Sequence, residues 1–124
     1  MVIAKYKVLI ELNGVTGLRR YIDLTCPMDE TDEVKMVMLQ FEQGVQEANI
    51  DKAKIYEVPD AGKRISWPLP GWLFDATYHL LQTEKPLWVN YLTTEVDGAE
   101  KLTHVELTSR DEKPGEGPAD AGFN

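Results

Sequence analysis

A two-residue alternation near the start of the chain constrains the fold more than any other feature. Over residues 4–12 every second side chain is apolar, and the positions between them are mainly charged. This period is typical of a β-strand with one buried face. Asn13 and Gly14 follow, and both tolerate the positive φ of a tight turn, while Gly17 favours a longer loop or a bulge. The sequence therefore predicts a β-hairpin whose return strand covers residues 18–25.

An acidic segment followed by an apolar stripe predicts a first helix, over about residues 29–49. Four carboxylates crowd its start, where they favour the positive end of the helix dipole; they are Asp29, Glu30, Asp32 and Glu33. Apolar side chains then recur at helical spacing, at Val34, Val37, Met38, Phe41, Val45 and Ala48. The run 34–39 alone would also suit a strand, but the longer stripe favours a helix.

The rest of the chain alternates turn signals with apolar segments. Strands are expected over residues 53–58 and 63–67, around a Pro59–Gly62 turn in which glycine takes the left-handed position. Pro68 and Pro70 should end that ladder because they lack an N–H. A second helix is then expected over residues 71–85, closed by Pro86, before a last hairpin of residues 87–96 and 102–109.

These elements predict an α+β fold with the order ββα-ββ-αββ. Its antiparallel sheet would hold about five to six strands, with two amphipathic helices on one face. Residues 1–110 would form one domain, since a chain of 124 residues has the usual length of one. Residues 111–124 are rich in proline, glycine and charge, and we expect an acidic disordered tail there.

Composition restricts the class of partner and the compartment. The net charge of -8 disfavours direct binding to nucleic acid, because phosphates repel an acidic surface. The single cysteine, Cys26, forbids an internal disulfide and favours a reducing compartment. No apolar run approaches the roughly 20 residues that span a bilayer, and no targeting segment is recognisable. We therefore expect a cytoplasmic protein that does not associate with membranes.

No segment carries a motif that is specific for a reaction, a cofactor or a metal. The thiol of Cys26 lies among carboxylates that disfavour a thiolate, so a small apolar residue at a strand end is the simpler interpretation. Asp75 and His79 are spaced to pair on a helix, but no third catalytic member is visible. His79 and His104 lack metal-ligand spacing. The sequence thus leans away from an enzyme and predicts no cofactor and no metal.

Two surfaces are candidates for binding another protein. The first is the acidic cluster Asp29, Glu30, Asp32 and Glu33, which could dock on a basic surface or could simply charge a helix start. The second is the rigid aromatic segment with Trp67, Leu69 and Trp72, which could form an interface or could plug the core. The aromatic segment could also join two copies of the chain as a homodimer.

The leading hypothesis is a non-enzymatic protein-binding module. In class alone the chain resembles small acidic α+β inhibitors, such as toxin-neutralising immunity proteins and phage-encoded inhibitors of host defence, which implies a basic partner. The alternative is a small-molecule-binding protein or a small enzyme, with a pocket between the helices and the sheet. The polar groups expected around that pocket are Arg20, Tyr21, Tyr56, Asp75, His79 and Tyr91.

Overall fold

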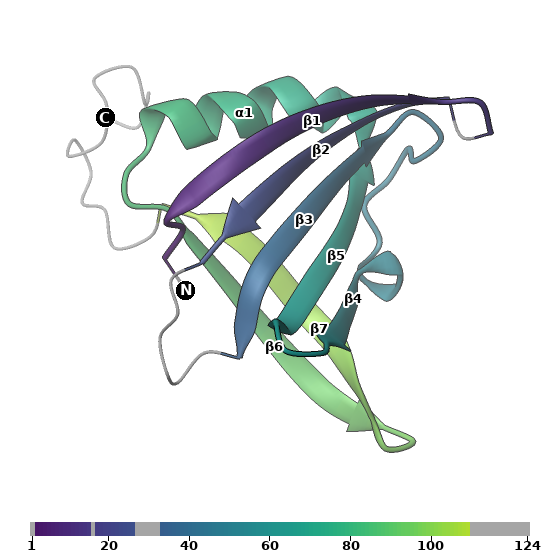
Figure 1. The fold of residues 1–124 in the computed structure, drawn as a ribbon, viewed down its shortest axis with the longest axis vertical. Coiled ribbons are helices and arrows are strands. Elements are labelled where there is room, and N and C mark those ends of the chain that lie inside the picture. Colours follow the sequence, from purple (N-terminus) through teal and green to yellow (C-terminus); the bar gives the residue numbers. More distant parts are fainter. Residues whose placement is uncertain (1, 16, 27–32, 110–124) are drawn as a thin grey trace.

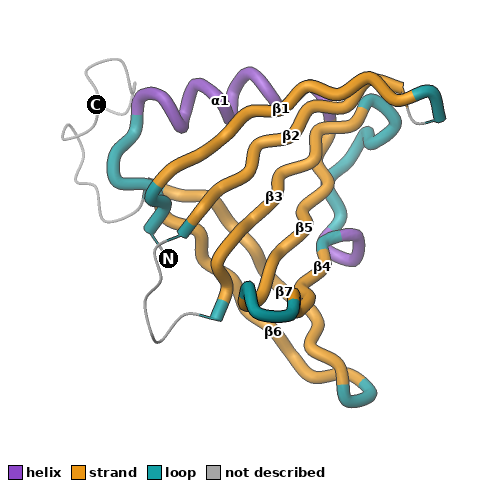
Figure 2. Tube along the Cα trace, in the orientation of Figure 1, coloured by secondary structure: helices purple, strands orange, loops and turns teal. Residues whose placement is uncertain are grey.

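Most of the described residues form β-strands, and one α-helix and two short 3-10 turns complete that part of the chain. The computed structural model describes residues 2–15, 17–26 and 33–109. Within them lie seven strands, β1 (Lys5–Asn13), β2 (Gly17–Thr25), β3 (Val34–Glu42), β4 (Lys54–Val58), β5 (Gly62–Pro70), β6 (Trp88–Val96) and β7 (Ala99–Thr108). The helical elements are η1 (Ile50–Lys52), η2 (Gly71–Leu73) and α1 (Phe74–Thr83) (Figure 2). The α+β class is confirmed, but the predicted number and order of helices are wrong.

The first five strands form one sheet with the order β1-β2-β3-β5-β4. Neighbours are antiparallel except for β3 and β5, which are parallel, so the purely antiparallel sheet that we predicted is wrong. The parallel pair arises because the connection after β3 passes beyond the position of β5. The chain first forms β4 at the edge and then returns between β3 and β4. The predicted tail, residues 111–124, lies outside the described residues.

The last two strands form a separate hairpin that faces the large sheet across one core. Figure 1 shows β6 and β7 crossing behind the five-stranded sheet, with α1 running alongside β1 at the top of the view. The core draws on the large sheet, α1 and the hairpin, and its fully buried side chains include Ile22, Leu24, Val37, Leu39, Phe41, Ile65, Val89 and Leu102. The two sheets and α1 thus bury their apolar faces together.

The segment predicted as the first helix is the central strand β3. A β-bulge between Val34 and Met36 shifts the register, so Val34 and Val37 both point into the core three residues apart. That spacing imitates a helix, whereas Val37, Leu39 and Phe41 alternate as a strand does. Leu39 lay off the helical stripe, yet it is fully buried. Its burial is what separates the two interpretations.

The proline segment also differs from expectation, since β5 continues through Pro70. Pro68 and Pro70 remain in register with β3, opposite Gln40 and Glu42. Because β4 pairs with β5 only as far as Ser66, the strand has a single neighbour at both prolines. The missing N–H groups can therefore face the open side of β5, as at a sheet edge.

The second predicted helix is shorter than expected. A 3-10 turn covers Gly71–Leu73, and α1 ends at Thr83. Phe74 and Leu81 are its buried residues, while Asp75 and His79 are exposed, as the pattern predicted. Phe74 meets Phe41 edge to face at 5.3 Å between ring centroids, and this contact places α1 on the core face of the large sheet.

The hairpin of β6 and β7 attaches differently to the two edges of the large sheet. At the β4 edge, β7 lies against β4 and η1, and Lys101 pairs with Asp51 at 3.3 Å. Near β1 the link is limited to the residues before the strand. Val2 bridges Trp88, and the Ile3 N–H donates to the Leu87 carbonyl at 2.9 Å. Most of β1 is therefore left without a strand on its outer side in the part of the chain described.

Candidate interaction surface

Strand β1 forms an open edge of the large sheet. It pairs with β2 over its whole length, from Lys5 opposite Thr25 to Asn13 opposite Gly17. No strand of the described chain pairs with its other side. A nine-residue edge presents a row of backbone groups on which another strand can add. The open edge is therefore the first component of a candidate binding surface.

Exposed apolar side chains accompany this edge. Ile10 is 64% exposed and Leu12 is 83% exposed, although both lie on the face of the sheet that carries the buried Ile22 and Leu24. Figure 1 shows the reason, because the hairpin of β1 and β2 projects beyond α1, so its core face has no cover there. We call the exposed residues Leu9, Ile10, Leu12 and Leu18 the edge patch.

Arg20 marks the point where the core ends and the edge patch begins. It lies opposite Ile10 in the ladder, and its guanidinium sits 4.5 Å from the Phe74 ring centroid. One of its nitrogens donates to the Gly71 carbonyl at 2.9 Å. The arginine therefore ties β2 to α1 through a cation–π contact and to η2 through a charge-assisted hydrogen bond. Phe74 and Gly71 thus hold the Arg20 side chain in place beside the edge patch.

The predicted aromatic segment divides between the core and the surface. Leu69 is buried, and Trp67 is partly buried against the core. Trp72 is 74% exposed and lines a hollow of about 570 Å³, together with Arg20 and Val45. Trp67 and Leu69 thus pack against the core, whereas Trp72 faces solvent, and an interface at Trp72 stays a prediction. Trp72 and the edge patch meet around Arg20, at the same end of the molecule.

Charged residues alternate on the outer face of the sheet beside the edge patch. Arg19 pairs with Glu42 at 3.2 Å and donates to the Tyr21 hydroxyl at 3.3 Å. These contacts, the hydrogen bond to Tyr21 first and then the negative charges of Glu42 and Glu11, raise the pKa of Arg19. Arg19 thus remains charged and is held between a carboxylate on β3 and another on β1.

The acidic cluster cannot be assembled as a surface from the described residues. Asp29, Glu30 and Asp32 lie outside them. Glu33 precedes a strand rather than opening a helix, and its carboxylate pairs with Lys63 at 2.6 Å. Lys63 also contacts Glu100 at 2.8 Å, which joins the β4–β5 turn to β7. Glu33 therefore forms an ion pair within the fold. The acidic docking patch stays a prediction, because its other three residues lie outside the described ranges.

The side chains predicted around a ligand pocket are not brought together. Arg20 faces the core side of β2 and Tyr21 faces the outer side, whereas Tyr56 is exposed on β4. Asp75 and His79 share a helix face but form no ion pair with each other in the described structure. Tyr91 packs against the core from β6. These residues therefore do not define one site.

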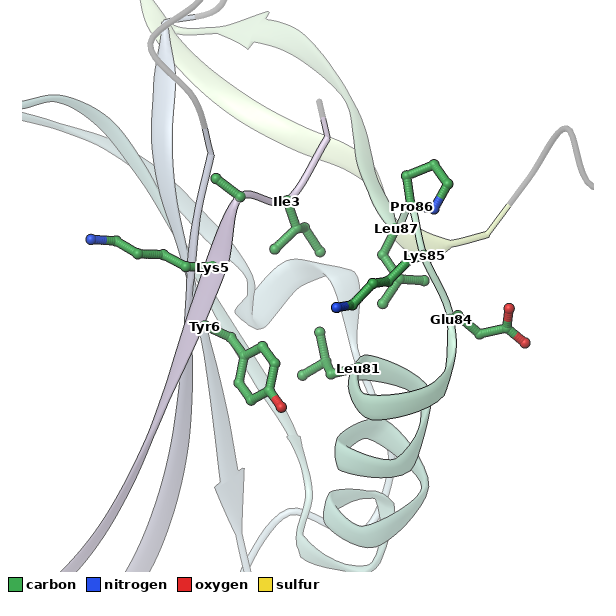
Figure 3. Close-up of a pocket in the computed structure, with 9 residues that line it drawn as sticks. Ile3, Lys5, Tyr6, Leu81, Glu84, Lys85, Pro86 and Leu87 are labelled. Atoms are coloured by element: carbon green, nitrogen blue, oxygen red, sulfur yellow. The ribbon is translucent and has the colours of Figure 1, made fainter. Parts of the chain in front are cut away.

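A separate cavity of about 610 Å³ lies between β1, the end of α1 and the segment before β6. Apolar residues form most of its wall, and they include Ile3, Leu81 and Leu87. Figure 3 shows Tyr6 and Lys85 extending toward the space, whereas Lys5 and Glu84 point away from it. None of the six predicted ligand residues lines this cavity. The cavity could not be predicted from the sequence, because β1 and residues 84–87 are far apart along the chain.

Metal-binding clusters and membrane-spanning helices are absent from the described ranges. No group of three or more histidine, cysteine or carboxylate side chains could hold a metal ion there. His104 pairs instead with Glu106 on the same strand, at 3.6 Å. Cys26 is buried. Among these residues no helix combines the length and the apolar character needed to cross a membrane.

The edge patch was not among the residues that the sequence singled out. Its signal was nevertheless present, because the apolar residues Leu9 and Ile10 adjoin and therefore point to opposite faces of β1. A strand with one buried face should be polar on the other, so this pair marks an additional apolar surface.

Comparisons of the chain with protein-family models, with curated proteins and with solved structures found no match.

Proposed function

We propose that this chain is a protein-binding module, without an enzymatic activity of its own, whose partner adds a strand to the open edge of β1. The observation that carries the proposal is the coincidence of an unpaired nine-residue edge with the exposed apolar side chains of the edge patch. Contiguous exposed apolar residues are typical of interaction sites, and Ile10, Leu12 and Leu18 share one face of the β1–β2 hairpin, with Leu9 on the other face. Main-chain hydrogen bonds would supply affinity, and the side chains beside them would supply specificity.

Trp72 of η2 extends the candidate binding surface next to the edge patch. Tryptophan is enriched among the residues that dominate binding energy, especially next to a partly enclosed hollow. Here the hollow beside Trp72 also contains Arg20, which is fixed by Phe74 and Gly71. A rigid support of this kind lowers the entropy that a partner must remove on binding.

The finer form of the hypothesis is an inhibitor of a basic protein. The net charge of -8 would speed association with such a partner. This form does not rest on the acidic cluster, because Glu33 is already paired with Lys63. It rests on the overall charge and on the availability of β1.

A site-specific photo-crosslinker tests the proposal. It would be placed at Ile10, which is 64% exposed on β1, and as a matched control at Leu92, which is 63% exposed on β6. In cells that naturally produce the chain, we expect a defined adduct with a protein, identified by mass spectrometry, from position 10 and not from position 92. Equal labelling at both positions, or no adduct at position 10, would contradict the proposal.

A second candidate function is the binding of a small anionic amphiphile. Its support is the 610 Å³ cavity, which lies in the size range of ligand pockets and has an apolar wall with Tyr6 and Lys85 extending toward it (Figure 3). A thermal-shift titration with dodecanoate, compared with dodecanol, tests this candidate. We expect dodecanoate to raise the Tm, and Lys85→Gln to reduce that rise while it leaves the ligand-free Tm unchanged. Equal shifts with both compounds would reject the candidate.

A further inference from the structure

We propose that the strand added to β1 comes from a second copy of this chain, paired antiparallel about Leu9. This inference rests on the proposed function and specifies the partner at β1 as a second copy, in place of the basic protein of the finer hypothesis. A two-fold axis through residue 9 places Leu9 opposite its own counterpart and residues 5–13 of one copy opposite residues 13–5 of the other. Those are the bounds of β1. The two five-stranded sheets would then continue as one.

Neighbouring contacts limit the register. Directly opposed residues in an antiparallel pair point to the same face, so the axis must pass through a residue and not between two. Moving it to Val8 would extend the pairing to Ile3, but the Ile3 N–H already donates to Leu87. Centring the axis on Leu9 uses all of β1 and disturbs none of the bonds that join residues 2 and 3 to the hairpin of β6 and β7.

Charge complementarity supports the same register. Lys7 and Glu11 lie two residues on either side of Leu9 and share its face, so Lys7 of each copy meets Glu11 of the other. Within one copy Lys7 is already opposite Asp23, and Glu11 is opposite Arg19. Lysine at a sheet edge ordinarily discourages pairing. Here Lys7 of each copy would face a carboxylate, whereas Lys5 would face Asn13.

The charges would form a continuous row of alternating sign across the junction. From one copy to the other, the order is Asp23, Lys7, Glu11, Arg19 and Glu42, with the change of copy between Lys7 and Glu11. Arg19 and Glu42 already form an ion pair at 3.2 Å. The symmetry repeats the row in the opposite direction, so no like charges are directly opposed across the junction. Opposite-charge neighbours across strands stabilise a sheet, and like charges destabilise it.

The apolar side chains of the other face also find partners. Ile10 would lie opposite Val8, and Leu12 opposite Tyr6, which is packed against Tyr78 at 6.2 Å between ring centroids. The most exposed apolar residues of β1 would thus lie against Val8, which packs on the core, and Tyr6, which packs on Tyr78. Self-complementary patches of this kind are the ordinary basis of two-fold homodimers.

Charge-reversal variants provide the test, with molar mass measured by sedimentation and light scattering over a range of concentrations. The wild-type chain should form a dimer. Lys7→Glu opposes two pairs of glutamates, and Glu11→Lys opposes two pairs of lysines, so each should raise the dimer Kd about tenfold or more. The double variant K7E/E11K, and an equimolar mixture of the two single variants, should restore dimerisation. Glu57→Lys on the opposite edge strand is the control, and it should leave the Kd unchanged.

Two results would overturn the inference. One is a chain that stays monomeric at every concentration, and the other is a dimer whose Kd is unaffected by K7E and E11K. Rescue by mixing distinguishes a lost contact from a misfolded variant, since a misfolded chain would not recover. If the crosslinker at Ile10 captures a different protein while the chain is monomeric, the proposed function stands and this inference fails. If it captures nothing, the proposed function itself fails.

Discussion

The two edges of the large sheet, β4 and β1, differ in length and in how far other elements cover them. At one edge, β4 is five residues long, and β7 and η1 lie against it. Ion pairs secure that side, with Lys63 between Glu33 and Glu100 and with Lys101 on Asp51. At the other edge, β1 is nine residues long and carries exposed leucine and isoleucine. One edge is therefore short and covered, whereas the other is long and open.

The covered β4 edge should contribute mainly to folding stability, and the open β1 edge mainly to binding. A covered edge adds apolar burial and ion pairs to the folded state, so changes there should lower the free energy of unfolding. An exposed apolar edge adds little to folding and creates a risk of unwanted pairing, which proteins normally suppress. Its retention in β1 is explained if another chain covers it. Substitutions near the β4 edge should consequently change the free energy of unfolding, whereas substitutions on β1 should change association with a partner.

The largest effect should come from a matched pair of isoleucine truncations. Ile65, beside β4, is fully buried, whereas Ile10 on β1 is mostly exposed. Ile65→Ala should lower the free energy of unfolding by about 2–5 kcal/mol, because it removes buried methyl groups and leaves a cavity. Ile10→Ala should change it by less than about 0.5 kcal/mol.

Chemical denaturation at protein concentrations low enough to keep the chain monomeric would measure both values. Ile10→Ala should instead weaken whatever association β1 supports, as judged by molar mass or by crosslinking. Comparable losses of stability in the two variants would show that β1 is as much a part of the folded core as β5, and the contrast between the edges would be wrong.

An intermediate effect is expected at the turn that leads into the covered edge. Gly62 has a φ of 79°, and a Cβ there would lie 3.0 Å from the Glu33 carbonyl oxygen and 2.8 Å from Cγ of Lys35. Gly62→Ala should cost about 1–3 kcal/mol of folding free energy, through backbone strain and this close approach. Gly14→Ala at the tip of the β1–β2 hairpin, where no heavy atom lies within 4 Å, is the control. A cost at Gly14 that equals the cost at Gly62 would remove the asymmetry.

Local signals predicted those parts of the fold that depend on neighbouring residues. The hairpins of β1 with β2, of β4 with β5 and of β6 with β7 follow from alternation and turn chemistry, and Gly62 takes the left-handed conformation predicted for it. The failure at β3 has a local cause, since the bulge before Met36 imitates helical spacing. The parallel pairing of β3 with β5 could not be predicted, because it depends on where a distant hairpin docks.

The candidate surface was less accessible to sequence reasoning than the fold. Trp72 was recognised from its residue type, and the structure separates it from the buried Leu69. The edge patch was missed, because an alternating strand does not reveal whether it lies at the edge or inside a sheet. The ion pairs of Lys63 were also hidden, since Glu33 and Glu100 lie far from it along the chain. Both features depend on topology.

The smallest expected effect concerns pH and the covered edge. The Lys63 ammonium lowers the pKa of Glu100 below its usual value of 4.5, and Thr93 adds a hydrogen bond of 3.0 Å to the same carboxylate. A carboxyl group whose pKa is depressed by folding stabilises the protein above its unfolded pKa. That contribution is lost as the pH falls from 4.5 through the depressed value.

Glu100→Gln should therefore lower the free energy of unfolding at neutral pH by at most about 1 kcal/mol, because the pair is partly solvated. The gap in free energy of unfolding between variant and wild type should narrow as the pH falls below 4.5 and through the depressed pKa of Glu100, because the carboxylate of the wild type then becomes protonated. Denaturant titrations at several pH values would measure this gap. A gap that did not change with pH would show that Glu100 acts through packing, and that the β4 edge is closed by the contacts of β7 rather than by the charge of Lys63.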